Sequence, residues 1–427
     1  MIEHIRFDGY RLLDGFEADF GPLTVVVGAN ATGKSSLLEA LSLVSLGLDW
    51  PIEDAIAFRG GMWSIATCAR DCDEIGWQLT LSKSADHPIW SHVPIALDAS
   101  CVYEARLGRD PLGKVLPRYE CLRYAHPRPG HREPFKMLEV EGQRARVFDP
   151  KSGKLTPFDQ PEPPSQVGTT VTDPIPSALE SRVQKSSLVL AQMRFEHQFP
   201  LPTWIRAYLA SFCYYPGFDV SRTSAVRTTP AEIRVQTALN ATGDNLGTVL
   251  HEILTRHDFR DAASELRDFL AAAYPQVEHI SSETAFGGEP RVLVRIREVG
   301  LRRGIEMWEL SDGMLRFLLL CTALLNPIAP GLIAIDEPEV GLHPKLLPIV
   351  ADVIRSAAER TQVLITTHSP QLLNAFALDN IAVLTREAAH AAWYRPGDRG
   401  SLVQMLESQL GGTLGELHAS GELEALP

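Results

Sequence analysis

The stretch LTVVVGANATGKSSLLEAL, residues 23–41, decides the fold. Its first five residues predict a buried strand, and the apolar pattern of residues 34–48 predicts a helix. The loop between them matches the pattern GxxxxGKS, in which glycines let the backbone curl so that its amides point at phosphate oxygens. Because strand, loop and helix follow in this order, the sequence predicts a nucleotide-binding P-loop rather than a simple glycine turn that caps a helix.

The residue types in this loop suit a nucleotide that binds together with magnesium. We expect Lys34 to reach the β and γ phosphates, and the hydroxyl of Ser35 to bind the metal. The predicted cofactors are therefore ATP and Mg²⁺. The loop residues assigned to binding them are Gly28, Asn30, Ala31, Thr32, Gly33, Lys34, Ser35 and Ser36.

Two later apolar runs end in polar residues that suit the same chemistry. LIAIDEPE, residues 332–339, predicts a buried strand that ends in Asp336, for the magnesium shell, and Glu337, to orient the attacking water. QVLITTHSP, residues 362–370, predicts a strand that delivers His368 to the same sheet edge as a γ-phosphate sensor. The alternatives are a solvated loop for the carboxylates and a bystander at a helix start for the histidine. The predicted catalytic residues are Glu337, His368 and Lys34.

A second anion-binding helix start is predicted at LSDGMLRFLLL, residues 310–320. One helix terminus contributes only about 0.3 to 1 kcal/mol per interaction at an exposed site, so we interpret this element as half of a composite site. Its place before the Asp336 strand is similar to the signature of ABC-type ATPases, which closes on the nucleotide of a second subunit. The resemblance implies that Ser311 and Gly313 act in trans, although Asp312 and Met314 replace the glycine and glutamine of transporter signatures.

The resemblance covers most of the chain. The entry segment of residues 2–41, LNATGDNLGTVLHEIL at 239–254, the signature, DEPEVGLHP, TTHSPQLL and the terminal LGELHASGELEALP together look like a stand-alone bacterial ATPase. The group is the SMC, RecF and OLD-like branch of AAA/ABC-type ATPases, here without the OLD nuclease domain. It implies an α/β P-loop NTPase fold, with an ABC-type head whose mixed central sheet is flanked by helices, an inserted antiparallel β-rich region and a helical subdomain.

The resemblance also assigns residues outside the loop. Arg11 resembles the arginine that follows the first strand in this branch and lies near the nucleotide. Ala31 stands where SMC and RecF proteins usually have glycine, which shifts the match towards OLD-like proteins. For the glutamine that senses magnesium, the choices are Gln78 in a predicted strand and Gln192 in a helical stretch, and we prefer Gln78.

The period of the hydrophobic residues and the positions of glycine and proline divide the chain into segments. The predicted segments are residues 1–85 and 276–427 for the two halves of the ATPase head, 86–176 for the β-rich insertion and linker, and 177–275 for the helical subdomain. The runs GWQLTLS, CVYEARL, FKMLEVEG and ARVFDP alternate and predict an antiparallel meander. We expect a mobile linker at 159–176, and further strands at 291–298 and 307–310.

Composition limits the remaining protein classes. With 427 residues and 45% hydrophobic content, the chain fits a globular protein of more than one domain. Its 53 acidic residues against 40 Lys and Arg give a net charge of -13, so any nucleic-acid contact would be local. The longest apolar run, residues 317–325, is far short of the roughly 20 residues that span a bilayer, and the N-terminus lacks the apolar core of a signal peptide. We expect a cytoplasmic protein that does not contact a membrane.

The segment KVLPRYECLRYAHPRPGHREPFK, residues 114–136, is the candidate for a nucleic-acid contact. Its arginines alternate with tyrosines, and such pairs grip a phosphate backbone and stack on bases. The alternative, which we favour, is a solvated hairpin, because charge runs usually have that meaning.

Three functions remain open at this point. The resemblance favours an ATP-dependent homodimer or higher assembly that switches a separate effector protein, a nuclease or toxin in phage defence. The alternatives are a RecF-like DNA-binding repair ATPase and the ATPase subunit of a transporter. We expect a separate effector because the residues after His368 are fewer than the roughly 100 of a typical domain, and they lack a carboxylate cluster suited to two metals.

Overall fold

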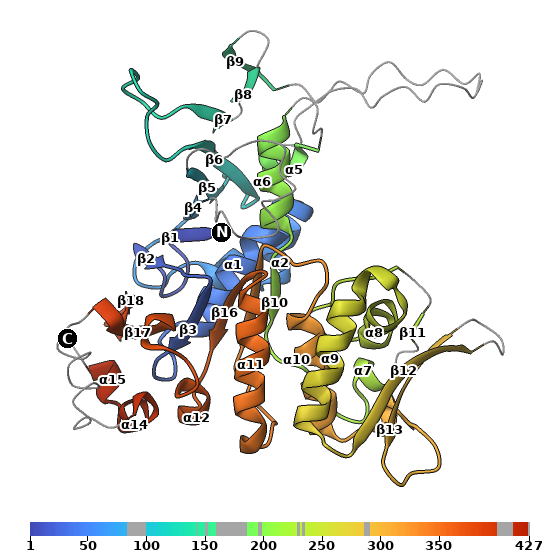
Figure 1. The fold of residues 1–427 in the computed structure, drawn as a ribbon. Coiled ribbons are helices and arrows are strands. Elements are labelled where there is room, and N and C mark those ends of the chain that lie inside the picture. The colour runs from blue at the N-terminus through green and yellow to red at the C-terminus, as the bar shows by residue number, and fades with distance from the viewer. Residues whose placement is uncertain are drawn as a thin grey trace, which may run out of the picture.

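The computed structural model describes the chain in ten stretches, which leave the predicted linker at 159–176 outside the described residues. The stretches are residues 1–82, 100–142, 144–149, 153–158, 186–194, 199–228, 231–232, 235–285, 291–398 and 413–425. Three sheets organise this part of the chain, and helices pack between and beside them (Figure 1).

The central sheet contains the strand that precedes the P-loop. Its order is β10 (Cys213–Tyr215), β15 (Leu332–Asp336), β16 (Gln362–Thr366), β3 (Leu23–Val27), β17 (Ile381–Glu387) and β18 (His390–Tyr394). The first five strands run parallel, and β18 pairs antiparallel with β17. This is the mixed sheet that the resemblance implied.

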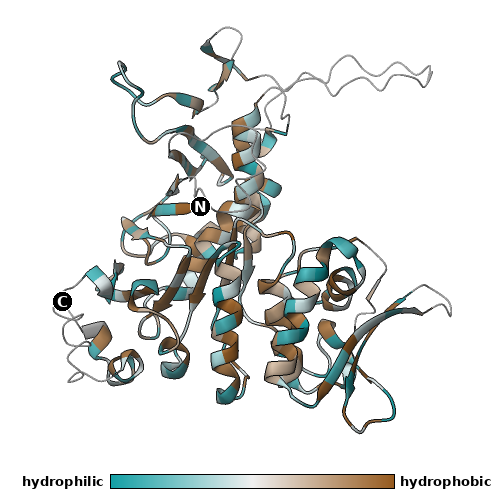
Figure 2. Cartoon of the chain, viewed as in Figure 1, coloured by the Kyte–Doolittle hydropathy of each residue, from teal (hydrophilic) through white to brown (hydrophobic). Residues whose placement is uncertain are grey.

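Helices cover both faces of this sheet, which explains why its inner strands β15, β16 and β3 are mostly apolar. In β3, Val26 packs into the hydrophobic cluster that contains α1 (Lys34–Asp49), whereas Val25 and Val27 pack into the cluster on the other face. That second cluster holds α10 (Asp312–Leu324) and α11 (Leu347–Ala358). Figure 2 shows these inner strands as the most hydrophobic part of the ribbon.

An eight-stranded antiparallel sheet stands beside the central one. Its order is β2 (Phe16–Asp19), β1 (Ile2–Asp8), β4 (Glu74–Leu81), β5 (Cys101–Arg109), β6 (Val115–Tyr124), β7 (Lys136–Glu141), β8 (Arg144–Asp149) and β9 (Lys154–Pro157). The predicted meander is confirmed. Because β4 pairs with β5, the sheet runs without a break from the first predicted segment into the second.

One buried amide joins the two sheets. The side chain of Gln362, at the start of β16, accepts a hydrogen bond from the backbone N–H of Ile2 at 2.9 Å and donates to its carbonyl at 2.8 Å. The same side chain also donates to the carbonyl of Gly21 at 2.9 Å. The N-terminal strand is therefore fixed to the base of the central sheet.

A third, smaller sheet lies with the helical region at the right of Figure 1. Its strands are β11 (Ala231–Glu232), β12 (Val277–Ala285), β13 (Arg291–Glu298) and β14 (Ile305–Glu306). The strand predicted at 291–298 is confirmed. The one predicted at 307–310 is wrong, because Met307–Glu309 form a 3-10 turn closed by a capping box between Glu306 and Glu309.

The other helices lie around these sheets. They are α2 (Ile52–Phe58), α3 (Met62–Ile65), α5 (Val189–Gln192), α6 (Pro200–Ala210), α7 (Ala225–Thr228), α8 (Leu246–Thr255), α9 (Arg260–Ala273), α12 (Pro370–Leu373), α14 (Leu414–Ser420) and α15 (Glu422–Ala425). The predicted helical segment 177–275 thus also contributes β10 to the central sheet. In the described part of the chain, no helix is both long and apolar enough to cross a bilayer.

Candidate nucleotide site

The loops that carry the predicted site residues leave one edge of the central sheet. The register of the parallel strands aligns Asp336 with Thr366, and Thr366 with Val26. The loops after β15, β16 and β3 therefore start at the same level, at the carboxyl ends of three adjacent strands. In open α/β sheets this is the edge at which ligands bind.

The P-loop has a backbone conformation that its glycines permit. At Gly33, φ is 108°, which L side chains rarely adopt. At Gly28, an added Cβ would lie 2.2 Å from the carbonyl oxygen of Leu384, so the loop passes too close to β17 for any side chain. Ala31 adopts a φ of 62°, in the left-handed region that glycine tolerates without strain.

Lys34 is buried at the start of α1 and reaches back over the loop. Its Nζ donates to the carbonyls of Gly28 at 2.7 Å and Ala29 at 2.9 Å. The hydroxyl of Thr32 donates to the Ala29 carbonyl at 2.9 Å and tightens the same turn. Among the predicted binding residues, Asn30, Ala31 and Ser35 are exposed at the loop surface.

The start of α1 offers an anion the positive end of the helix dipole. Within α1, which is described throughout, the first turn carries no acidic residue, and no side chain caps it. Arg11 lies beside this turn, with Nη1 3.4 Å from the Ser36 hydroxyl and 2.7 Å from a Glu39 carboxylate oxygen. The structure therefore brings Arg11 to the first turns of the P-loop helix.

The turn after β15 is held by the neighbouring strand. The hydroxyl of Thr366 donates to Asp336 Oδ1. The backbone N–H of Glu337 donates to both oxygens of Thr366, the carbonyl at 3.2 Å and the hydroxyl at 3.1 Å. Glu337 adopts a φ of 49°, so its backbone is strained where the predicted catalytic carboxylate begins. Sequence reasoning did not single out Thr366, which is fully buried.

His368 lies against the carboxylate of Glu337. Its Nε2 is 3.7 Å from Glu337 Oε1, and its ring stacks on that of His418 from α14 with centroids 6.2 Å apart. Burial lowers the pKa of His368 below 6.5, the charge of Lys34 lowers it further, and Glu337 opposes the shift. The imidazole is therefore neutral near pH 7. The structure thus brings together Lys34, Glu337 and His368, and adds a histidine that the sequence did not indicate.

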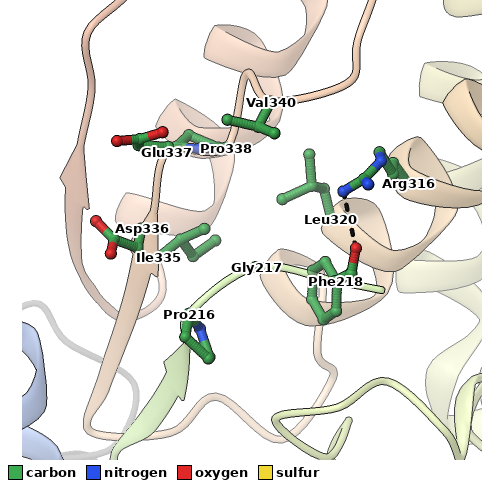
Figure 3. A pocket seen from close by; sticks show the side chains of 10 residues that line it. All are labelled: Pro216, Gly217, Phe218, Arg316, Leu320, Ile335, Asp336, Glu337, Pro338 and Val340. Carbon is green, nitrogen blue, oxygen red and sulfur yellow. Dashed lines mark hydrogen bonds between the residues drawn. The ribbon is translucent and has the colours of Figure 1, made fainter. Parts of the chain in front are cut away.

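A cavity of about 230 Å³ lies on the α10 side of the Asp336 turn. Arg316 of α10 lines it and donates from Nη1 to the carbonyl of Phe218 at 2.8 Å. Asp336 and Glu337 lie on the side of the cavity opposite Arg316. Figure 3 shows their carboxylates pointing away from Arg316. Asp336 and Glu337 both line this cavity, so it adjoins the turn that carries the predicted site carboxylates.

The predicted signature forms the start of α10. Ser311 is its N-cap residue, and the Ser311 hydroxyl accepts from the N–H of Met314 at 3.3 Å. Asp312 pairs with the buried Arg227 at 2.7 Å. An added Cβ on Gly313 would meet the Gly341 carbonyl at 3.8 Å, so this glycine borders the turn that follows DEPE.

Gln78 lies apart from the central sheet. In β4 it stands between Arg6 of β1 and Glu104 of β5, within the eight-stranded sheet. The alternative, Gln192, donates to the carbonyls of Ser187 and Leu188 beside α5. The magnesium role of Gln78 stays a prediction.

The arginines of the segment 114–136 contact their own hairpin. The guanidinium of Arg128 covers the rings of Tyr124 and Phe135, at 5.1 and 4.5 Å from the ring centroids. Arg118 donates to the carbonyl of Arg109, and Arg123 to that of Tyr124. The segment includes β6, in which Glu120, Cys121 and Leu122 are buried within the sheet, and a nucleic-acid contact here stays a prediction.

Comparison with known proteins identifies the kind of domain that carries these residues. Residues 235–374 match the family described as "AAA domain, putative AbiEii toxin, Type IV TA system". Over this third of the chain, the sequence is similar to an AAA-type domain. The matched range holds the signature, the Asp336 turn and His368, and the P-loop lies before it.

Solved structures show the same fold for the chain as a whole. An SMC head bound to the C-terminal winged-helix domain of ScpA is similar with a TM-score of 0.52, at 12% identity, over 92% of this chain and 97% of that one. An SMC head from Pyrococcus furiosus, with an extended coiled coil and bound to the C-terminal domain of ScpA, has a TM-score of 0.50, at 11% identity, over 95% and 99%. The chain thus shares the fold of SMC head domains.

A curated relative matches over a short stretch. The OLD nuclease of Thermus scotoductus is 39% identical over 51 residues, which cover 12% of this chain and 10% of that protein. The match therefore spans a tenth of the relative's length.

Proposed function

We propose that this protein binds and hydrolyses ATP at the carboxyl edge of its central sheet, and that ATP closes it into a dimer that controls a separate effector. The observation that carries the first part is the convergence of Lys34, Glu337 and His368. They come from three distant segments, yet His368 lies 3.7 Å from the Glu337 carboxylate and feels the charge of Lys34. Such a group suits phosphoryl transfer, where positioning and charge stabilisation do most of the catalysis.

Each of these residues has a distinct role in the proposal. Lys34 exchanges its two loop carbonyls for the β and γ phosphate oxygens. Glu337 accepts a hydrogen bond from the attacking water and orients it towards the γ-phosphorus. His368, neutral near pH 7, donates a hydrogen bond to the γ-phosphate.

The available donors fit magnesium. Mg²⁺ prefers oxygen ligands and usually binds through one or two protein groups together with phosphates and water. The Ser35 hydroxyl and the Asp336 carboxylate are of this kind, and the Thr366 hydroxyl fixes Asp336. When bound, the metal neutralises charge on the β and γ phosphates.

The second part of the proposal concerns assembly. Ser311 and Gly313, at the start of α10, contact the nucleotide on the P-loop of a second copy, so two copies enclose two nucleotides. The ABC-like order of P-loop, signature and Asp336 strand supports this arrangement. The effector is a nuclease or toxin, as the family description and the OLD nuclease match suggest.

Hydrolysis is tested with two variants of opposite effect. Glu337→Gln should bind ATP with wild-type affinity and lose hydrolysis by about 100-fold or more, because only the water-orienting carboxylate is gone. Lys34→Ala should weaken binding itself. Binding is measured by calorimetry and turnover by phosphate release. A Glu337→Gln protein with wild-type turnover would remove this residue from its role.

Assembly is tested by mixing inactive subunits. Lys34→Ala and Ser311→Arg proteins should each lack activity, and their mixture should regain part of it, because one of the two composite sites becomes whole. Light scattering of Glu337→Gln should show a dimer with ATP. A monomer at saturating ATP would refute the dimer.

Affinity purification of the ATP-trapped Glu337→Gln form from native cells identifies the effector. A pure protein that cleaves DNA by itself would refute the proposal of a separate effector protein.

A further inference from the structure

The carboxylate of Glu339 collects three hydrogen bonds from the segment that carries His368. Its Oε1 accepts from the Thr367 hydroxyl at 2.7 Å, the His368 backbone N–H at 2.9 Å and the Ser369 backbone N–H at 3.2 Å. The donors belong to three successive residues that follow β16. One oxygen therefore fixes the backbone on both sides of the His368 Cα.

These bonds join the turn after β15 to the loop after β16. The same two segments are also joined where they leave the sheet, because Thr366 binds Asp336 and the N–H of Glu337. Glu339 lies two residues beyond Glu337, and its side chain returns to the other loop. The turn with Asp336 and Glu337 and the loop with His368 are thus bonded to each other at both ends.

The His368 side chain takes no part in these hydrogen bonds to Glu339. Only the main chain of His368 binds Glu339, and its imidazole faces Glu337 and the ring of His418. A carboxylate that holds backbone amides around a side chain sets the direction of that side chain without touching what it binds.

We propose that Glu339 is a positioning residue, which holds residues 367–369 so that the His368 imidazole stays against Glu337 at the nucleotide site. The inference rests on the proposed ATPase function and deepens it, because it adds a residue to the machinery of hydrolysis. Glu339 sets the distance between the group that orients water and the group that binds the γ-phosphate.

Two variants with side chains of about the same length as glutamate distinguish the effect of the hydrogen bonds from the effect of the charge. In the described part of the chain, Glu339 Oε2 is buried without a partner, so all three bonds use Oε1. Glu339→Gln keeps an acceptor at that position and loses the charge, whereas Glu339→Met loses both. Since the bonds are responsible for positioning, kcat should fall about 10- to 100-fold in Glu339→Met and stay near wild type in Glu339→Gln. KM for ATP should change little in either, because the P-loop is intact.

A second readout needs no nucleotide. Hydrogen exchange of the free protein, resolved by residue, should show slow exchange at the amides of His368 and Ser369 in wild type and Glu339→Gln. In Glu339→Met the His368 amide should lose its protection and the Ser369 amide part of it, because the Ser369 N–H also donates to the Thr367 hydroxyl at 3.0 Å, while amides of β3 and α11 keep theirs. Loss at these two amides alone separates positioning from a general loss of stability.

The outcomes distinguish this inference from the proposed function. A wild-type kcat in Glu339→Met, or unchanged exchange at both amides, would overturn the inference and leave the ATPase standing. A wild-type protein without ATPase activity would overturn both. If Glu339→Met does not fold, Thr367→Val removes one of the three bonds to Glu339 and the bond that the Thr367 hydroxyl accepts from the Ser369 N–H, and we expect a smaller fall in kcat with partial loss of protection. No change in either property of Thr367→Val would count against the proposal.

Discussion

Replacement of Arg227 tests whether the signature is built as the structure shows. The Arg227 side chain is 6% exposed. Its Nε donates to the carbonyl of Val220 at 2.8 Å, and its Nη1 to those of Trp308 at 3.0 Å and Leu310 at 2.8 Å. Nη2 donates to Asp312 at 2.7 Å. Arg227→Met keeps much of the stem and removes all four bonds, so it should release the start of α10.

The magnitude follows from these contacts. A net loss of about 1 kcal/mol for each of the three carbonyl bonds gives about 3 kcal/mol. The ion pair adds under about 1 kcal/mol, because the Asp312 side chain is 69% exposed and water screens it. Asp312→Asn should therefore cost under about 1 kcal/mol, whereas Arg227→Met should cost about 3. Arg227→Lys should recover little, since an ammonium cannot match the forked donor.

Urea denaturation of the three variants measures these differences, and hydrogen exchange shows whether the loss is local to residues 306–315. Because the P-loop is separate from Arg227, the Arg227→Met protein should bind ATP as wild type does but should not dimerise with it. Equal stability losses in Arg227→Met and Asp312→Asn would refute the reasoning, since they would show that the carbonyl bonds contribute nothing. ATP-driven dimers of Arg227→Met would show that the signature does not depend on this arginine.

Two further substitutions test the P-loop and a buried carboxylate. Gly28→Ala forces a Cβ to 2.2 Å from the Leu384 carbonyl and should lower ATP affinity by about tenfold or more, measured by calorimetry. The control is Gly21→Ala, whose Cβ would have its nearest contact at 3.5 Å, and its ATP affinity should not fall. Burial raises the pKa of Glu120 to about 7 from 4.5, so its contribution to stability is present below about pH 4.5 and is lost as the pH rises through about 7. Urea midpoints should fall over that range in wild type and stay flatter in Glu120→Gln; equal slopes would contradict this assignment.

Long apolar runs and the P-loop pattern predicted the centre of the fold correctly. The strands before the P-loop, Asp336 and His368 are fully buried between two helical layers, so each reads as an uninterrupted apolar run. The strand β10 was not predicted, because three residues are too few to show a period. The stretch Met307–Glu309 begins with two large apolar residues, which are common in strands, but the capping box between Glu306 and Glu309 closes a turn instead.

The supporting contacts of the site could not be predicted because they join residues far apart in sequence. Thr366 and Asp336 belong to different strands, and only the register of β15 and β16 brings them level. Arg227 and Asp312 are 85 positions apart in the sequence, and no single motif contains both residues. Sequence reasoning therefore singled out side chains for which a chemical role is proposed, and missed those that hold them in place.

Backbone strain in this protein gathers where the nucleotide is proposed to bind. Four residues other than glycine have positive φ in the described chain: Arg11, Ala31, Glu337 and Ala388. Ala388 lies in the two-residue turn between β17 and β18, where such angles are ordinary. The other three border the P-loop or carry the proposed catalytic carboxylate, and each conformation costs about 1–2 kcal/mol. Neighbouring strands and turns must supply that energy, as Thr366 does by binding the N–H of Glu337. The backbone that carries the Glu337 carboxylate is thus held by β16.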